Sequence, residues 1–140
     1  MSETNIFNWD QGKFGLNVAA MDREHQELIS IMNQLFQENE KGASKAQLMK
    51  IVETLAQKTQ NHFANEEKYF SGLEKYTQTS AHKMIHQDLL KKFGDHVGKM
   101  KSSTEGKIPQ DFFMFLKVWL SAHICGIDRK YAEAAGAKSA

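Results

Sequence analysis

Histidine and carboxylate residues recur in this sequence of 140 residues at intervals that fit one face of an α-helix. His62 is followed four residues later by Glu66, and His82 is followed at the same distance by His86. Residues four apart lie about 40° apart around a helix and about 6 Å apart along it, so both can bind one metal ion or two adjacent ions. The complete set of candidate metal ligands is His25, His62, Glu66, His82, His86, His123 and Asp128.

Apolar residues recur every three or four positions and the chain has a single proline, which predicts an all-α protein. The expected helices span residues 22–40, 44–70, 80–100 and 109–134. Asp22 is the expected N-cap of the first helix, and Ser44 with Gln47 predicts a capping box at the second. Pro109 suits the first position of the fourth helix. Because the connections are short, we expect an antiparallel up-down-up-down four-helix bundle.

The length of the chain suits one compact domain over residues 1–140, with an N-terminal arm at 1–21 and a flexible tail at 135–140. Cys125 is the only cysteine, so an internal disulfide is impossible and we expect a cytoplasmic location. No stretch approaches the roughly 20 apolar residues of a membrane span. The formal charge is +1 with dispersed lysines, so nucleic acid is not an expected partner. We expect a monomer.

The bundle topology tests the metal-site hypothesis independently. His25 and His82 lie near the starts of the first and third predicted helices, whereas Glu66 and Asp128 lie near the ends of the second and fourth. In an up-down-up-down bundle all four positions are at the same end. Seven protein ligands exceed what one ion accepts, so the pattern predicts two metal ions, and imidazoles combined with carboxylates favour iron.

The spacing of His123 and Asp128 does not fit a regular α-helix, because five residues turn the two side chains about 140° apart. A π turn brings residues i and i+5 onto one face, so we expect a π-bulge between the two candidate ligands. Gly126 lies between them and would ease the distortion.

Three other residues that could carry chemistry have structural interpretations. His96 lies on a different face of its helix from His82 and about 21 Å along the axis from it, so we expect it to be exposed. Cys125 is expected to be an inert buried thiol. Asp22 is favoured as an N-cap over a hydrogen-bond acceptor for His25.

Taken together, these residues resemble the hemerythrins, in particular the single-domain bacteriohemerythrins. The shared motifs extend over nearly the whole chain: Trp9, Val18-x-x-Met21-Asp22-x-x-His25-x-x-Leu28, His62-Phe63-x-x-Glu66-Glu67, His82-x-x-x-His86, and Trp119-Leu120-x-x-His123-Ile124-x-x-x-Asp128-x-x-Tyr131. The resemblance implies reversible dioxygen binding at a non-haem di-iron centre, with no substrate consumed, so the protein is not expected to be an enzyme.

The resemblance also implies roles for individual residues. One iron is held by His82, His86 and His123. The other iron is held by His25 and His62, and Glu66 and Asp128 bridge the two irons. The irons share an oxo or hydroxo bridge, and dioxygen binds end-on to one iron as hydroperoxide. The oxygen pocket of the family corresponds to Leu28, Phe63, Trp119, Leu120 and Ile124. Tyr131 is a candidate neighbour of the ligands, and an oxygen-consuming enzyme is a candidate recipient.

Three positions depart from the family pattern. Asn17, Phe70 and Thr77 stand where glycine, methionine and proline are expected. None of the three is a candidate ligand, so the metal assignment is unaffected. The departures leave the shape of the pocket and the conformation of one loop without a prediction.

Other functions compete with oxygen carriage. Ferritin-like di-iron enzymes use Glu-x-x-His pairs and mostly carboxylate ligands, and no Glu-x-x-His occurs here, which disfavours a di-iron oxidase. A module for oxygen or redox sensing that acts on a separate partner remains an alternative. So does a protein for nitric-oxide chemistry or iron handling.

Overall fold

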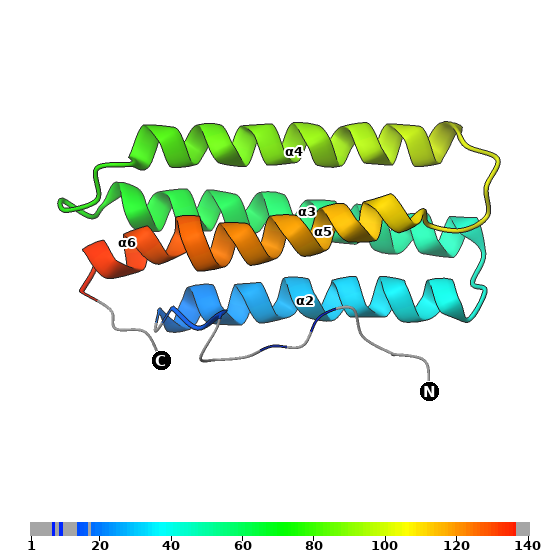
Figure 1. Ribbon diagram of the computed structural model, residues 1–140, viewed down its shortest axis with the longest axis horizontal. Helices are drawn as coiled ribbons and strands as arrows, with labels where there is room; N and C mark the ends of the chain where they lie inside the picture. Colours follow the sequence, from blue (N-terminus) through cyan, green and yellow to red (C-terminus); the bar gives the residue numbers. More distant parts are fainter. Residues whose placement is uncertain (1–6, 8, 10–13, 17, 137–140) are drawn as a thin grey trace.

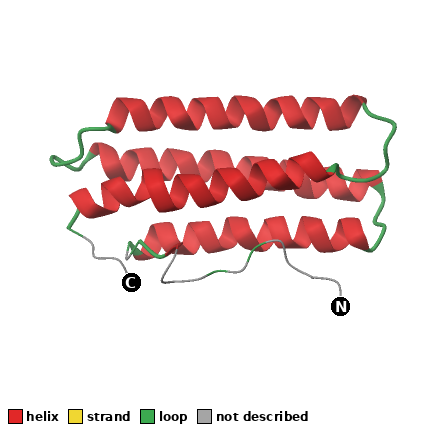
Figure 2. Ribbon diagram, viewed as in Figure 1, coloured by secondary structure: helices red, strands yellow, loops and turns green. Residues whose placement is uncertain are grey.

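A computed structural model describes residues 7, 9, 14–16 and 18–136 of the chain. The bundle is built from α2 (Ala19–Glu40), α3 (Lys45–Ser71), α4 (Thr79–Ser102) and a fourth helix made of α5 (Gln110–Ala122), the π-helical η1 (His123–Asp128) and α6 (Arg129–Ala134). Consecutive helices run antiparallel (Figure 1). The described residues contain no strand (Figure 2). The predicted all-α four-helix bundle is confirmed.

The helix ends follow local sequence signals at two of the connections. The Ser44 hydroxyl accepts a hydrogen bond from the Gln47 N–H, and the Gln47 side chain accepts one from the Ser44 N–H, so the predicted capping box is present. Gly42, just after α2, has a φ of +81°, a conformation that glycine adopts without strain. Pro109, which was predicted to occupy the first helical position, is instead the N-cap of α5, one residue before the first helical residue, Gln110.

The prediction that Asp22 caps the first helix was wrong. α2 begins at Ala19, after Val18, so Asp22 lies inside its first turn. The Asp22 carboxylate is buried and accepts a hydrogen bond from the N–H of Leu16 at 2.9 Å. Asp22 therefore stabilises the segment that precedes the helix, where a buried N–H would otherwise lack a partner.

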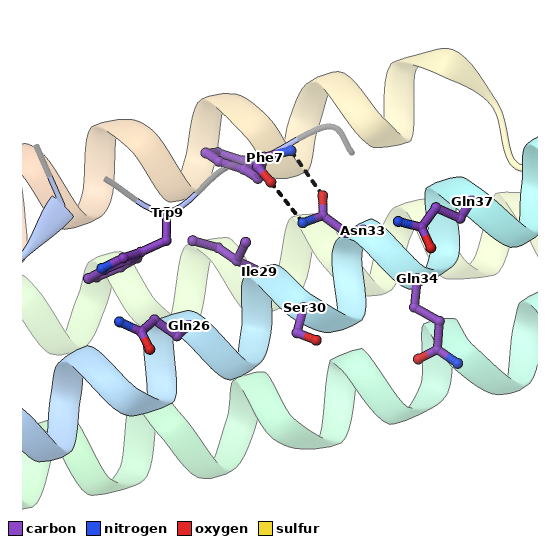
Figure 3. A pocket seen from close by; sticks show the side chains of 8 residues that line it. All are labelled: Phe7, Trp9, Gln26, Ile29, Ser30, Asn33, Gln34 and Gln37. Atoms are coloured by element: carbon purple, nitrogen blue, oxygen red, sulfur yellow. Dashed lines mark hydrogen bonds between the residues drawn. The ribbon is translucent and has the colours of Figure 1, made fainter. Parts of the chain in front are cut away.

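Amide side chains on α2 hold two irregular segments against the bundle. Asn33 accepts a hydrogen bond from the Phe7 N–H at 2.9 Å and donates one to the Phe7 carbonyl at 2.7 Å (Figure 3). Asn39 binds the N–H and carbonyl of Ile108 in the same way, at 2.9 and 3.4 Å, and so fixes the loop before α5. Most of the predicted arm, and residues 137–140 of the predicted tail, lie outside the described residues.

The interior of the bundle has an apolar part and a polar part. Met32, Leu35, Leu55, Phe112 and Leu116 are completely buried in the apolar part, and burying each such side chain stabilises the fold by about 1.5–3 kcal/mol. The polar part lies at the end of the bundle where α2 and α4 begin. Among the described residues, no helix is both long and apolar enough to cross a lipid bilayer.

Two predicted environments differ from those in the structure. His96 is half-buried, with its ring 4.8 Å from that of Phe115 and 5.6 Å from that of Phe112. The prediction that His96 is exposed was wrong because aromatic rings of α5 cover this part of α4. Cys125 is half-buried rather than buried.

Candidate metal centre

The structure brings all seven candidate ligands together at one end of the bundle, and each is at most 5% exposed. They come from every helix of the bundle: His25 from α2, His62 and Glu66 from α3, His82 and His86 from α4, and His123 and Asp128 from η1. Two groups of these side chains could each hold a metal ion, and both groups contain Glu66 and Asp128.

The fourth helix contains the predicted π-bulge. η1 is a π-helical turn of six residues, from His123 to Asp128. It turns both side chains inward, with His123 Nε2 only 2.9 Å from Asp128 Oδ1. The role predicted for Gly126 is not supported, because a Cβ atom there would meet nothing within 4 Å and the φ angle is not positive.

The two carboxylates separate the histidines into two sets. Asp128 Oδ1 lies 3.0 Å from His82 Nε2, whereas Oδ2 lies 3.1 Å from His25 Nε2. Glu66 repeats this division, with Oε1 at 2.9 Å from His86 Nε2 and Oε2 at 3.3 Å from His62 Nε2. Each carboxylate therefore presents one oxygen to each set, as a carboxylate that bridges two ions would.

The distances between the donor atoms suit metal ligands better than hydrogen bonds. His123 Nε2 lies 3.2 Å from His82 Nε2 and 3.1 Å from His86 Nε2, and one ring nitrogen can donate only one hydrogen bond. Two ligands at right angles around an ion, with bonds of about 2.1 Å, are about 3.0 Å apart. Within the described residues His25 Nε2, His62 Nε2 and both Asp128 oxygens are buried without a hydrogen-bond partner. The donor set therefore fits a metal centre.

Three outer partners orient the histidine rings, and none of them was predicted from the sequence. The Nδ1 atoms of His62 and His86 lie 2.7 and 2.9 Å from the carboxylates of Glu24 and Glu67. His82 Nδ1 lies 2.8 Å from the hydroxyl of Tyr76. With each Nε2 facing the cluster, each Nδ1 carries the proton and donates it, which fixes the ring orientation.

Tyr131, the one neighbour of the ligands that the sequence did suggest, donates a hydrogen bond to Glu66 Oε2 at 2.9 Å. Its ring also lies 5.6 Å from that of Tyr69, which the sequence did not single out. Tyr131 is completely buried, and burial together with the charge of Glu66 holds the pKa of its hydroxyl far above the usual range. The hydroxyl therefore stays protonated and orients the carboxylate.

Before a metal ion binds, the cluster retains protons. Burial alone would lower the pKa of His62, but the charge of Glu66 and the hydrogen bond to Glu24 outweigh it and raise that pKa to about 10. Burial would also lower the pKa of His123, but the charge of Asp128 outweighs it and raises that pKa to about 9. Burial also works against ionisation of Asp128, yet its contacts with His123 hold the pKa of Asp128 well below the usual range.

We expect metal binding to tighten as the pH rises from 6 to 8. His62 and His123 are protonated below their raised pKa values of about 10 and 9 and belong to different groups of candidate ligands, so each of two incoming ions must displace one of these protons. Displacing one proton changes the apparent affinity for each ion by about tenfold per pH unit. Titration of the metal-free protein with Co²⁺ against a chelator, followed by the visible absorption of Co²⁺, measures this slope. An affinity that does not change with pH would contradict it.

Apolar and aromatic side chains surround the ligands. The five predicted pocket residues, Leu28, Phe63, Trp119, Leu120 and Ile124, are each at most 6% exposed. Phe63 stacks on His86 with ring centres 3.9 Å apart, and Phe70 stacks on His82 at 4.5 Å. Phe70, which departs from the family pattern, thus packs directly on a candidate ligand. Thr77 is exposed in a loop, and Asn17 lies outside the described residues.

Comparisons with known proteins agree with this geometry. The family described as the hemerythrin HHE cation binding domain matches residues 16–135. A bacteriohemerythrin of Clostridium acetobutylicum is 28% identical over 131 residues, which cover 91% of this chain and all of that protein. A myohemerythrin of Riftia pachyptila is 31% identical over 128 residues, 88% of each chain. A crystal structure of wild-type hemerythrin has a TM-score of 0.80 at 26% identity and covers 92% of this chain and 97% of its own.

Proposed function

This chain belongs to the hemerythrin family, and we propose that it binds dioxygen reversibly at a pair of non-haem iron ions. In this proposal His82, His86 and His123 hold one iron. His25 and His62 hold the other, and Glu66 and Asp128 bridge the two. The observation that carries the proposal is the division of both carboxylates between the two histidine sets. Bound iron would supply the two electrons that dioxygen takes up on binding and returns on release.

The protein contributes the binding geometry and a dry environment. Glu24 and Glu67 hold His62 and His86 by their Nδ1 atoms, so the rings need not reorient when a ligand arrives. The buried pocket residues exclude water, which would otherwise provide protons and promote side reactions of an oxygen adduct. Five imidazoles and only two carboxylates place little negative charge on the metals, which favours release of oxygen over its further reduction.

We further propose that the chain acts as one cytoplasmic domain and as a monomer that delivers dioxygen to an oxygen-consuming enzyme. The lone thiol of Cys125 supports a reducing compartment. Oxygen or redox sensing through a separate partner is the second candidate function, because the same centre would change charge on oxidation.

Repeated oxygenation tests the proposed function. We expect the reduced, iron-loaded protein to gain a visible charge-transfer band when dioxygen is added and to lose it when dioxygen is removed, over several cycles. Elemental analysis should give two irons per chain. Steady consumption of dioxygen in the presence of a reductant would instead indicate an oxidase, and zinc or a single ion per chain would contradict the di-iron assignment.

A further inference from the structure

A cavity of about 190 Å³ opens between α2 and α3 beside the His25 and His62 set. Its lining consists of Glu24, Glu27, Leu28, Lys58, Asn61, His62 and Asn65. Leu28 and His62 form its inner end, since they are only 1% and 3% exposed. A liquid-like water occupies about 30 Å³, so the cavity has room for several molecules of two or three atoms.

The inner end of the cavity adjoins the candidate metal centre. The rings of His62 and His25 lie 4.5 Å apart. Leu28 follows His25 by three residues, so the two side chains are neighbours on one face of α2. A small molecule that passes Leu28 therefore arrives at His25 and His62, the set with two histidines rather than three.

An ion pair spans the outer part of the cavity. Lys58 Nζ on α3 lies 2.7 Å from Glu27 Oε1 on α2, and both side chains are about half exposed. Glu24 lies deeper, held by His62 and by a hydrogen bond from the Asn65 amide at 3.0 Å. The lining thus carries two carboxylates and one ammonium group.

We infer that this cavity is the entrance to the His25 and His62 half of the centre, and that Glu24, Glu27 and Lys58 make it selective for neutral molecules over anions. The excess negative charge repels anions at the entrance, while a neutral diatomic molecule meets no electrostatic barrier. The inference rests on the proposed function because it assumes that one metal ion has an open position. Such selectivity keeps small anions from competing with dioxygen for that position.

Association of azide with the iron-loaded, oxidised protein tests the inference by stopped-flow absorption. The Lys58→Gln variant leaves two carboxylates unbalanced and should bind azide about two- to fivefold more slowly, whereas Glu27→Gln leaves Lys58 unpaired and should bind it faster by a similar factor. Both differences should shrink as salt is added. Association of dioxygen with the reduced protein should change in the same direction, or not at all, in both variants.

A matched ion pair on the surface provides the control. Glu53 and Lys101 lie 3.6 Å apart and are about 60% exposed, and neither lines the cavity. Glu53→Gln and Lys101→Gln make the same changes in charge and should leave the azide rate unchanged. Equal azide rates in all four variants and the wild type, or no azide binding by Glu27→Gln, would overturn the inference.

The same measurements separate the entrance from the proposed function. Azide binding requires an accessible metal ion but not reversible oxygenation. Opposite shifts of the azide rate in a protein that does not release dioxygen would support the entrance and reject the carrier function. Reversible oxygenation with unchanged azide rates would support the carrier function and overturn the entrance.

Discussion

Replacing Asp128 with alanine is expected to leave the bundle folded but to reduce the metal content from the proposed two ions per chain to one or none. Its Oδ1 lies 2.9 Å from His123 Nε2 and its Oδ2 lies 3.1 Å from His25 Nε2. Alanine therefore removes one ligand from each metal group at once. Loss of a group outside the ligands typically costs 10- to 100-fold in affinity, so loss of a shared ligand should cost at least about 100-fold for each ion.

Two variants make the result for Asp128 interpretable. Asp128→Asn keeps the size of the side chain and one carbonyl oxygen, so it should retain more metal than alanine does. Asp88→Ala removes an exposed carboxylate that pairs with Lys92 on the surface of α4 and should not change the metal content. Elemental analysis after dialysis gives the stoichiometry, and circular dichroism reports the fold and Tm. A fully metallated Asp128→Ala protein would refute the bridging role.

The loss of metal should also lower Tm. A ligand that binds only the folded state stabilises it by RT ln(1 + [L]/Kd), so a 100-fold weaker ion contributes about 2.7 kcal/mol less. The Tm of Asp128→Ala should therefore fall below that of wild type when metal is present. Without metal the two should differ less.

The convergence of the ligands was predictable from the sequence because it depends on rules that act locally. Helical periodicity places His62 and Glu66 on one face, and short connections fix the direction of each helix. The π-bulge was predictable for the same reason, since a regular helix cannot turn both His123 and Asp128 inward. The structure contains this bulge.

The outer partners of the histidines could not be found in this way. Glu67 lies about 140° around α3 from His62, so α3 considered alone turns it away from the other candidate ligands. In the bundle it faces α4 and contacts His86 Nδ1 at 2.9 Å. Such a pairing depends on how two helices are rotated against each other. One available signal was the position of Glu24 and Glu67 directly beside candidate ligands in the sequence.

Contacts with residues outside the helix concerned also explain the wrong predictions for Asp22 and His96. Aspartate is a common N-cap residue, but the carboxylate of Asp22 instead accepts a hydrogen bond from the buried N–H of Leu16 in the preceding segment. His96 follows Phe93 by three residues and precedes Met100 by four, both of which are buried, and Phe115 of α5 covers it. Phe93 and Met100 were therefore a signal within α4, whereas Leu16 and Phe115 lie outside the helices from which the two predictions were made.

Deleting Gly126 is expected to preserve the metal centre, whereas deleting Ala122 is expected to abolish it. Without Gly126 the aspartate follows the histidine by four residues, and a regular α-helix then turns both side chains to within about 40° of each other. Gly126 is exposed and nothing lies near its Cβ position, so no packing is lost. Ala122 is also exposed, but its removal rotates every later residue by about 100° relative to α5.

The two deletions remove one small, exposed residue each, on opposite sides of His123, and give chains of equal length whose compositions differ only by one glycine and one alanine. Metal stoichiometry and the visible spectrum of the Co²⁺-loaded proteins should separate them completely, with two ions in one and none in the other. If both deletions lose the metal, the π turn supplies more than the direction of Asp128. In that case the positions of Ile124 and Cys125 within the turn must also be required, because these residues are the ones that a regular helix would displace.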